Sequence, residues 1–281
     1  MSVHSAEVFA SLHRVGEPLL LANAWDVASA VAVQAAGAHA IATTSAGVAW
    51  SLGVPDAGGL DAEHAAAVIG RIAAAVSVPV SADIEAGYGD SPDAVATTVA
   101  AVLRAGAVGV NLEDRRDGGS LFGAAEQAER LTAARTAAGE VPVWINARTD
   151  IFLSKACPSI AAGVAAALER AAVYKVAGAD SLFVPGLVEL RALTELAAGP
   201  LPVAVMAGPG APTVAELTAA GVVRISLGPA IAQAAYGLAA RAAAELFTSG
   251  TYNSSANGVE YLTMNGALSK VSAPPGTPSH P

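Results

Sequence analysis

The feature that most constrains the fold of this chain is an alternation of short apolar runs, rich in Val and Ile, with longer Ala-rich segments. The short runs are typical of strands covered on both faces, and the longer segments have the length of helices. Gly37, Gly106, Gly178 and Gly221 each follow a predicted helix and lead directly into the next strand. Strict alternation with short connections favours a parallel sheet, and eight repeats favour a closed (β/α)8 TIM barrel over an open doubly wound sheet.

The predicted elements fill most of the chain. The strands are expected near Leu19–Asn23, Ala40–Thr43, Val78–Asp83, Gly109–Glu113, Val143–Arg148, Ser181–Val184, Val203–Met206 and Arg224–Leu227. The helices are expected at Val27–Ala36, Ala62–Val76, Pro92–Ala105, Ala124–Ala138, Ser159–Ala177, Val188–Ala198, Val214–Ala220 and Ala230–Phe247. The barrel is predicted to occupy residues 1–250. Residues 251–281 are predicted to form an extension with a short helix, packed on a neighbouring subunit, and a Pro/Ser-rich tail that is extended or disordered.

Charge and cysteine content narrow the classes of function. The net charge of −9 and the pI near 5.0 argue against nucleic acid or an anionic membrane surface as a partner, because both require a concentrated positive face. The single cysteine, Cys157, and the absence of a signal-like N-terminus lead us to expect a cytoplasmic protein. Residues 27–55 lack charged side chains, but they carry Gln, His and a Thr-Thr-Ser triplet that a membrane helix would not.

Polar side chains gather where the predicted strands end. Asn23, Ser45, Asp83, Glu85, Glu113 and Arg148 all lie at or just after such an end, whereas the strand starts are blander. In a (β/α)8 barrel the carboxyl ends of the strands form one mouth, and chemistry is located there. We therefore expect the functional site at this mouth.

Three of these residues are carboxylates that would repel one another. Like charges at ~4 Å cost several kcal/mol at intermediate dielectric, so a bound cation is the simplest compensation for Asp83, Glu85 and Glu113. No histidine lies at a strand end, which favours Mg2+, or Mn2+, over zinc. The alternative is that each carboxylate caps a helix or pairs with Arg115, Arg116 or Arg148.

Substrate binding is predicted for the same mouth. Arg148 would take a carboxylate in a forked pair, and the backbone N–H groups around Ala46 and Gly47 would face a developing enolate oxygen. The alternatives are an ion pair between Arg148 and Asp150, and a plain tight turn at Ser45-Ala46-Gly47. The three lysines, Lys155, Lys175 and Lys270, are predicted to lie outside strands, which disfavours Schiff-base and pyridoxal enzymes.

Six segments give the chain a resemblance to the isocitrate lyase and phosphoenolpyruvate mutase superfamily. They are "LLLANAWDVASA" (Leu19–Ala30), "IATTSAGVAWSLGVPD" (Ile41–Asp56), "SADIEAGYGD" (Ser81–Asp90), "GVNLEDR" (Gly109–Arg115), "NARTD" (Asn146–Asp150) and "LFVPG" (Leu182–Gly186). The resemblance implies a barrel whose eighth helix is swapped between subunits of a dimer or tetramer. It implies Mg2+ near Asp83, with Glu85, Glu113 and Asp56 acting mostly through water, and substrate contacts at Ser45, Ala46, Gly47 and Arg148.

The chain departs from the superfamily pattern in the loop Arg115–Gly123. This loop has neither the cysteine motif of the lyases nor the lysine and asparagine of the mutases. Gly186 and Met206 align with a glutamate and an asparagine of the methylisocitrate lyase branch. Cys157 follows another strand, and we expect it to be inert. The loop could be a lid with glycine hinges or a solvated turn.

We therefore expect a Mg2+-dependent carbon–carbon lyase or decarboxylase for a small 2-oxo or 2-hydroxy di- or tricarboxylate. Asp56, Glu113 and Arg148 are its predicted catalytic residues, and a metal-stabilised enolate is its predicted intermediate. One alternative is phosphonopyruvate chemistry of the phosphoenolpyruvate mutase type. Another is a barrel that binds a 2-oxo acid with little catalysis. The sequence does not name the substrate or the proton donor.

Overall fold

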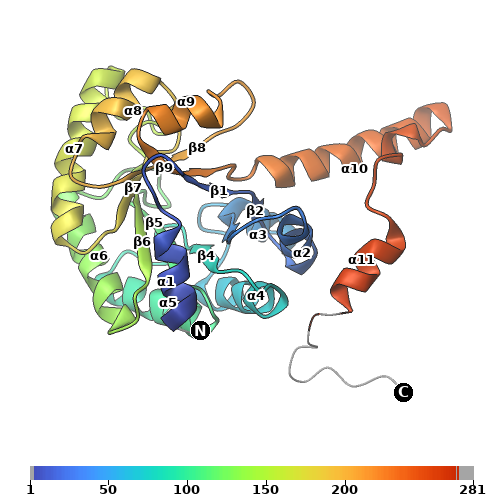
Figure 1. Ribbon diagram of the computed structural model, residues 1–281, viewed down its shortest axis with the longest axis horizontal. Helices are drawn as coiled ribbons and strands as arrows, with labels where there is room; N and C mark the ends of the chain where they lie inside the picture. Colours follow the sequence, from blue (N-terminus) through green and yellow to red (C-terminus); the bar gives the residue numbers. More distant parts are fainter. Residues whose placement is uncertain (1–2, 270, 272–281) are drawn as a thin grey trace.

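The computed structural model describes residues 3–269 and 271, and its centre is a nearly closed barrel of parallel strands surrounded by helices (Figure 1). The strand order in the described residues is β1-β9-β8-β7-β6-β5-β4-β3-β2. The strands are β1 (Leu19–Leu21), β2 (Asn23–Ala24), β3 (Ile41–Thr43), β4 (Val80–Asp83), β5 (Gly109–Glu113), β6 (Trp144–Arg148), β7 (Ser181–Phe183), β8 (Val203–Met206) and β9 (Val222–Ser226). The predicted TIM barrel is confirmed.

The first predicted strand is divided into two strands, β1 and β2, which lie at the two ends of the sheet. β1 pairs with β9, and β2, which resumes after Ala22, pairs with β3. Asn23 joins these strands, because its side-chain amide donates to the Thr43 carbonyl at 2.9 Å and its oxygen accepts from the Leu227 N–H at 3.0 Å. This polar residue at a strand end therefore has a structural role.

Most helices lie within a residue or two of their predicted positions. They are α2 (Val27–Ala35), α4 (Ala62–Ala75), α5 (Pro92–Arg104), α6 (Ala124–Ala138), α7 (Ile160–Val176), α8 (Leu190–Ala197), α9 (Val214–Ala219) and α10 (Ala230–Ser249). Side-chain N-caps at Asp26, Asp61, Ser91 and Ser159 explain where four of them begin.

Two helices were not predicted. α3 (Ser45–Ser51) replaces the tight turn considered for Ser45-Ala46-Gly47, so that alternative is wrong. α1 (Val3–Ser11) covers the amino-terminal end of the barrel, where the buried Phe9 leaves no room for a side chain at Gly109. His13, just after α1, stacks on Trp144 with ring centroids 3.9 Å apart.

The interior of the barrel is less apolar than the sequence led us to expect. A layer of buried polar side chains crosses it: Ser81, Asn111, Asn146, Ser181 and Arg224. Hydrogen bonds join neighbours in this layer, among them Asn146 to Asn111 at 2.8 Å and Ser181 to Asn146 at 2.6 Å. The expectation that strand starts are blander is wrong at Ser181 and Arg224, which begin two of the predicted strands and are buried polar residues.

The C-terminal part of the chain leaves the barrel. α10 extends away from it, and Ala232 is its one buried residue (Figure 1). A 3-10 turn (Asn253–Ser255) and α11 (Tyr261–Leu268) follow, and α11 contacts α2 of the same chain. A short helix in this extension, packed on a neighbouring subunit, was predicted; α11 is such a helix, its packing on a second copy stays a prediction, and most of the Pro/Ser-rich tail lies outside the described residues. Among those residues no helix combines the length and the apolar character needed to cross a membrane.

Candidate functional site

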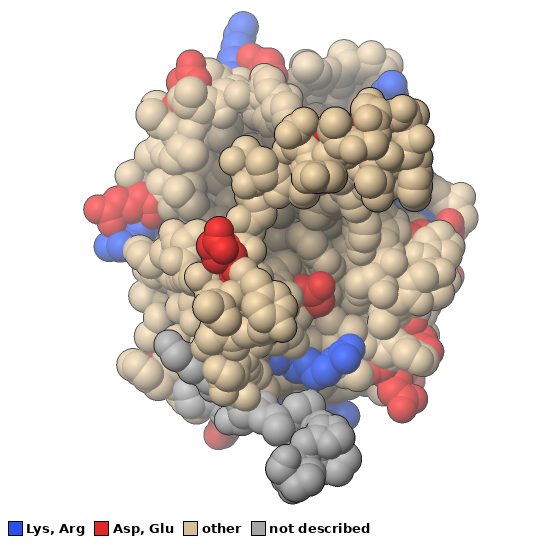
Figure 2. Space-filling view, turned by 90° about the vertical axis from the view of Figure 1, so that its right-hand side faces the viewer, with Lys and Arg blue, Asp and Glu red and all other residues tan. Residues whose placement is uncertain are grey.

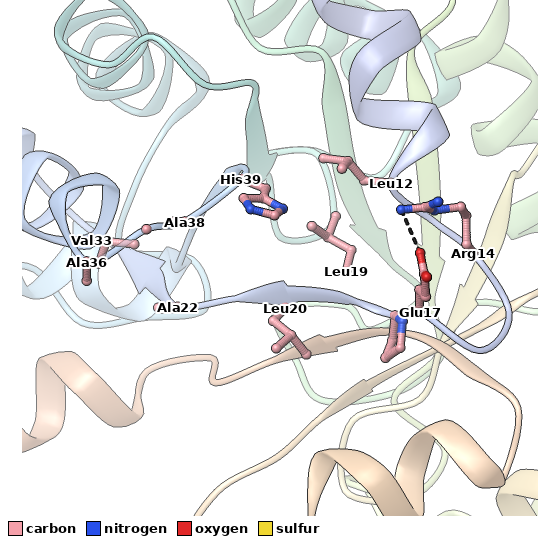
Figure 3. Close-up of a pocket in the computed structure, with 12 residues that line it drawn as sticks. Leu12, Arg14, Glu17, Leu19, Leu20, Ala22, Val33, Ala36, Ala38 and His39 are labelled. Carbon is pink, nitrogen blue, oxygen red and sulfur yellow. Dashed lines mark ion pairs between the residues drawn. The ribbon is translucent and has the colours of Figure 1, made fainter.

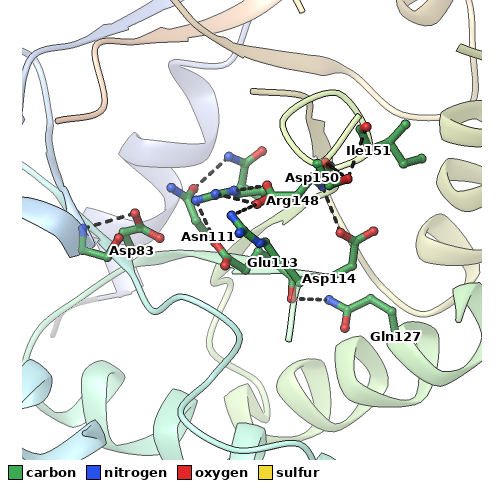
Figure 4. Close-up of polar contacts among 12 residues, drawn as sticks. Asp83, Asn111, Glu113, Asp114, Gln127, Arg148, Asp150 and Ile151 are labelled. Carbon is green, nitrogen blue, oxygen red and sulfur yellow. Dashed lines mark hydrogen bonds and ion pairs between the residues drawn. The ribbon is translucent and has the colours of Figure 1, made fainter. Parts of the chain in front are cut away.

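The carboxyl ends of β4, β5 and β6 bring the predicted site residues to one mouth of the barrel. Asp83 ends β4, Glu113 ends β5 and Arg148 ends β6, and Glu113 and Arg148 are partners in the parallel register. Figure 4 shows Glu113, Arg148 and Asp150 close together, with Asp83 to one side and Asp114 on the other. This gathering was predicted from the strand ends.

Arg148 is held on both sides by carboxylates. Its Nε donates to Asp150 Oδ1 at 2.6 Å and its Nη2 to Asp150 Oδ2 at 2.9 Å, while Nη1 lies 2.7 Å from Glu113 Oε2. The ion pair with Asp150, left open by the sequence, is thus present and occupies the guanidinium fork. Burial lowers the pKa of Arg148, but Glu113 and Asp150 outweigh burial and raise it, so the side chain stays cationic.

A second layer of polar groups supports Asp150. The carboxylate of Asp114, fully buried, accepts from the Asp150 N–H at 2.9 Å, from Arg170 Nη1 at 3.0 Å and from the Tyr174 hydroxyl at 3.0 Å. Sequence reasoning missed this network. The available signals were that Asp114 directly follows Glu113, and that Arg170 and Tyr174 are spaced i, i+4 on one helix face.

Asp83 and Glu85 each retain a buried oxygen atom without a partner. Asp83 Oδ2 accepts from the Ser45 N–H at 3.3 Å and Glu85 Oε2 accepts from the Gly58 N–H at 3.2 Å. Asp83 Oδ1 and Glu85 Oε1 have no hydrogen-bond partner among the described residues. Buried polar atoms normally have one, so these two oxygens are where a cation could bind.

Burial is the main influence on the pKa values of these acids. Burial raises the pKa of Asp83, and Arg148 opposes the rise. Burial, followed by the charges of Asp56 and Asp83, raises the pKa of Glu85 to about 7. Burial also raises the pKa of Glu113, against the effect of Arg148. Asp56 is exposed in the loop after α3, and its charge contributes to the raised pKa of both Asp83 and Glu85.

The carboxylates do not form a ready-made metal cage. In residues 3–269 and 271, no group of three or more His, Cys, Asp or Glu side chains is arranged to hold a metal ion. Direct ligation by all three of Asp83, Glu85 and Glu113 therefore does not match this geometry, because Glu113 is paired with Arg148. Ligation by Asp83 with the other acids acting through water is compatible with it and stays a prediction.

Ion pairs fix the start of the loop Arg115–Gly123 against neighbouring segments. Arg116 bridges Asp90 at 2.8 Å and Glu126 at 2.5 Å, and its guanidinium lies 3.8 Å from the centre of the Phe122 ring. Arg116 thus faces acids of the protein itself, while Arg115 Nη1 lies 4.0 Å from Asp150 Oδ2. Whether the loop moves as a lid stays a prediction.

The cavity shown in Figure 3 lies elsewhere. It has a volume of about 460 Å³ and is lined by residues that precede β1 and β3, including Pro18 and His39, with the Arg14–Glu17 ion pair at its edge. It therefore lies toward the amino-terminal ends of the strands, opposite the mouth where barrel enzymes place their chemistry. It also lacks the paired carboxylates of the mouth.

Several known proteins are similar to this chain over most of its length. An uncharacterized protein of Mycobacterium tuberculosis is 39% identical over 78% of this chain and 81% of its own length. The 2-methylisocitrate lyase of Escherichia coli is 32% identical over 70% of this chain and 68% of its own. A structure described as a putative phosphonomutase from Burkholderia cenocepacia is 46% identical, with a TM-score of 0.81 over 85% of this chain and 98% of that one.

One more distant structure shares the fold. A phosphonopyruvate hydrolase, crystallised with oxalate and Mg2+, is 21% identical, with a TM-score of 0.80 over 93% of this chain and 95% of that one. The family described as Phosphoenolpyruvate phosphomutase matches residues 9–247. This chain therefore belongs to the phosphoenolpyruvate phosphomutase family, within the superfamily whose segments its sequence resembles.

Proposed function

We propose that this enzyme is a Mg2+-dependent carbon–carbon lyase or decarboxylase acting on a small 2-oxo or 2-hydroxy di- or tricarboxylate. The observation that carries the proposal is the pair of buried, unpartnered oxygens, Asp83 Oδ1 and Glu85 Oε1, at the same mouth as the cationic Arg148. The oxygens favour a hard cation, and the guanidinium favours an anion. A 2-oxo acid that chelates the cation and presents a carboxylate to Arg148 would satisfy both preferences.

The donor set fits Mg2+ or Mn2+. Asp83 would hold the ion directly, with Glu85, Glu113 and Asp56 acting through water, as the superfamily resemblance implies. Oxygen donors without histidine or thiolate suit these hard ions. The bound ion supplies Lewis-acid chemistry at the oxygens of a 2-oxo acid.

The residues of the chain bind and orient the substrate. Arg148 would take a substrate carboxylate in place of Asp150 or Glu113, since carboxylates already occupy its fork in the structure. Ser45, Ala46 and Gly47 form the first turn of α3. The Ser45 N–H donates to Asp83, whereas the N–H groups of Ala46 and Gly47 lack intrahelical partners and would face an oxyanion. The loop has no cysteine, so solvent would deliver the proton to the product carbanion.

The test is turnover of purified protein with Mg2+ and four substrates: oxaloacetate, 2-methylisocitrate, isocitrate and phosphonopyruvate. We expect pyruvate, succinate or glyoxylate from one of the first three. An Asp83→Asn variant, which keeps the size of the side chain but loses its charge, should lose this activity. Conversion of phosphonopyruvate alone would contradict the proposal in favour of mutase chemistry. Binding of oxalate without any turnover would identify a binding protein instead.

We also propose that the enzyme is a homo-oligomer that exchanges α10. This helix carries exposed apolar residues, Tyr236, Leu238, Leu246 and Phe247, and on the outer face of β1 Leu20 is 51% exposed. Figure 2 shows that the face bearing the projecting helix has few charged side chains and is hollowed beside it. A helix of a second copy would cover such apolar surface. Sedimentation should show a dimer or tetramer for the wild type and a smaller species for Leu238→Asp, and a wild-type monomer would refute the proposal.

A further inference from the structure

Arg224 is a buried arginine without an acidic partner. Its side chain is 1% exposed, and no ion pair in the described part of the chain includes it. Nη2 donates to Asn111 Oδ1 at 3.0 Å and lies 3.4 Å from Ser81 Oγ, and Nη1 has no hydrogen-bond partner among the described residues. Buried arginines normally face a carboxylate, so this charge calls for an explanation.

The register places Arg224 directly beneath the candidate site. Its two partners, Ser81 and Asn111, precede Asp83 and Glu113 by two residues on β4 and β5. Residues two apart lie on the same face of a strand, about 7 Å along it. The guanidinium therefore lies one layer below the acids of the mouth, inside the barrel.

The other surroundings of Arg224 do not neutralise it. Burial, and next the charge of Arg224, lower the pKa of His13 to about 3, so this imidazole is neutral. The Phe9 ring lies 5.9 Å away and offers only a weak cation–π contact. Burial lowers the pKa of Arg224 itself to about 10, and Asp83 is the acid that opposes this effect. Arg224 stays protonated at neutral pH, and its field acts on the mouth.

We propose that Arg224 supplies a fixed positive charge beneath the mouth. This charge weakens the binding of the cation and strengthens the binding of the anionic substrate. The inference rests on the proposed function in that it assumes a cation and an anion at this mouth. With Arg148 and one divalent ion counted, the ionised carboxylates of Asp83, Glu85, Glu113 and Asp150 still leave the mouth negative, which disfavours a dianionic substrate. A buried cation one layer below offsets that charge without occupying substrate space.

A purely structural role, in which Arg224 ties β9 to β4 and β5, makes a different prediction. Loss of a structural tie would disorder the mouth and weaken the binding of both ligands. Loss of a fixed charge should change the two affinities in opposite directions. Opposite signs are therefore the signature of the proposal.

The experiment measures two dissociation constants by calorimetry on the full chain. These are the Kd of Mn2+ alone and the Kd of oxalate at saturating Mn2+. In Arg224→Met we expect Mn2+ to bind about tenfold more tightly and oxalate about tenfold more weakly, the change expected for removing one nearby charge at low dielectric. Arg224→Lys, which keeps the charge, should stay near wild type. Arg104→Met, which removes an exposed charge in the last turn of α5, should change neither.

The possible results separate the proposal for Arg224 from the proposed function. Two weakened affinities, or two unchanged ones, in Arg224→Met would overturn the proposal while the proposed function stands on the wild-type binding. A wild type that binds neither ligand would refute the proposed function, and the inference with it. If Arg224→Met does not fold, as judged by circular dichroism, Arg224→Gln removes the charge while keeping a donor for Asn111, and the same opposite signs are required.

Discussion

Replacing Arg148 by Met would test how the mouth of the barrel is held together. The guanidinium contacts Asp150 at 2.6 and 2.9 Å and Glu113 at 2.7 Å, and the side chain of Asp150 is fully buried. Removing one partner of a buried ion pair leaves an uncompensated charge and costs ~3–5 kcal/mol. Typical domains have a free energy of unfolding of ~5–15 kcal/mol, so the variant should fold but with much lower stability.

The loss of stability should grow with pH. Burial raises the pKa of Glu113, and Arg148 opposes this rise in the wild type. Without Arg148, the pKa of Glu113 in the folded state rises further above its value in the unfolded chain. At a pH between these two values, folding requires the uptake of a proton. Each unit of pH within that window then removes up to ~1.4 kcal/mol per carboxyl group. Relative to wild type, the additional loss begins above the pKa that Glu113 has beside Arg148, so the variant should be more destabilised at pH 7.5 than at pH 5.5.

Urea denaturation at pH 5.5 and pH 7.5 measures both the loss in free energy of unfolding and its dependence on pH. Arg148→Lys keeps a positive charge but not the fork, and it should lose less stability with a weaker dependence on pH. Arg104→Met serves as the control for removal of an exposed arginine. A loss below ~1 kcal/mol at pH 7.5, or an equal loss at both pH values, would refute the reasoning that these carboxylates depend on Arg148.

Three further predictions concern other parts of the molecule. Phe9→Ala should lower the free energy of unfolding by ~3–5 kcal/mol in urea, because this ring is fully buried; a loss under ~1 kcal/mol would mean that α1 is not part of the core. The affinity for Mn2+ should rise as the pH increases through about 7, where burial places the pKa of Glu85, and calorimetry at pH 6 and 8 should find no such rise in Glu85→Gln. Tyr174→Phe removes a 3.0 Å hydrogen bond to the buried Asp114 and should cost ~1 kcal/mol or more in urea, so an unchanged midpoint would exclude a contribution from this bond.

Much of the candidate site could be predicted because barrel topology turns sequence position into spatial position. Asp83, Glu113 and Arg148 each end a strand, so the parallel register brings them to one mouth whatever the details of packing. Side-chain pairing was not predictable in the same way. The sequence left open whether Arg148 faces a substrate or Asp150, and rotamers and burial settled that it contacts Asp150 in this structure.

The sequence by itself determined the order of strands and helices, the closed parallel barrel and the end of the barrel that carries the acids. These follow from local periodicity, from glycine at the ends of helices and from the alternation of side chains along strands, which are all properties of neighbouring residues. Only the tertiary structure decided that Asp114, Arg170 and Tyr174 meet behind Asp150, and that Arg224 lies beneath Asp83 without an acidic partner. The physical reason is that these contacts join residues more than 50 positions apart, and their energies depend on burial, which no local pattern encodes.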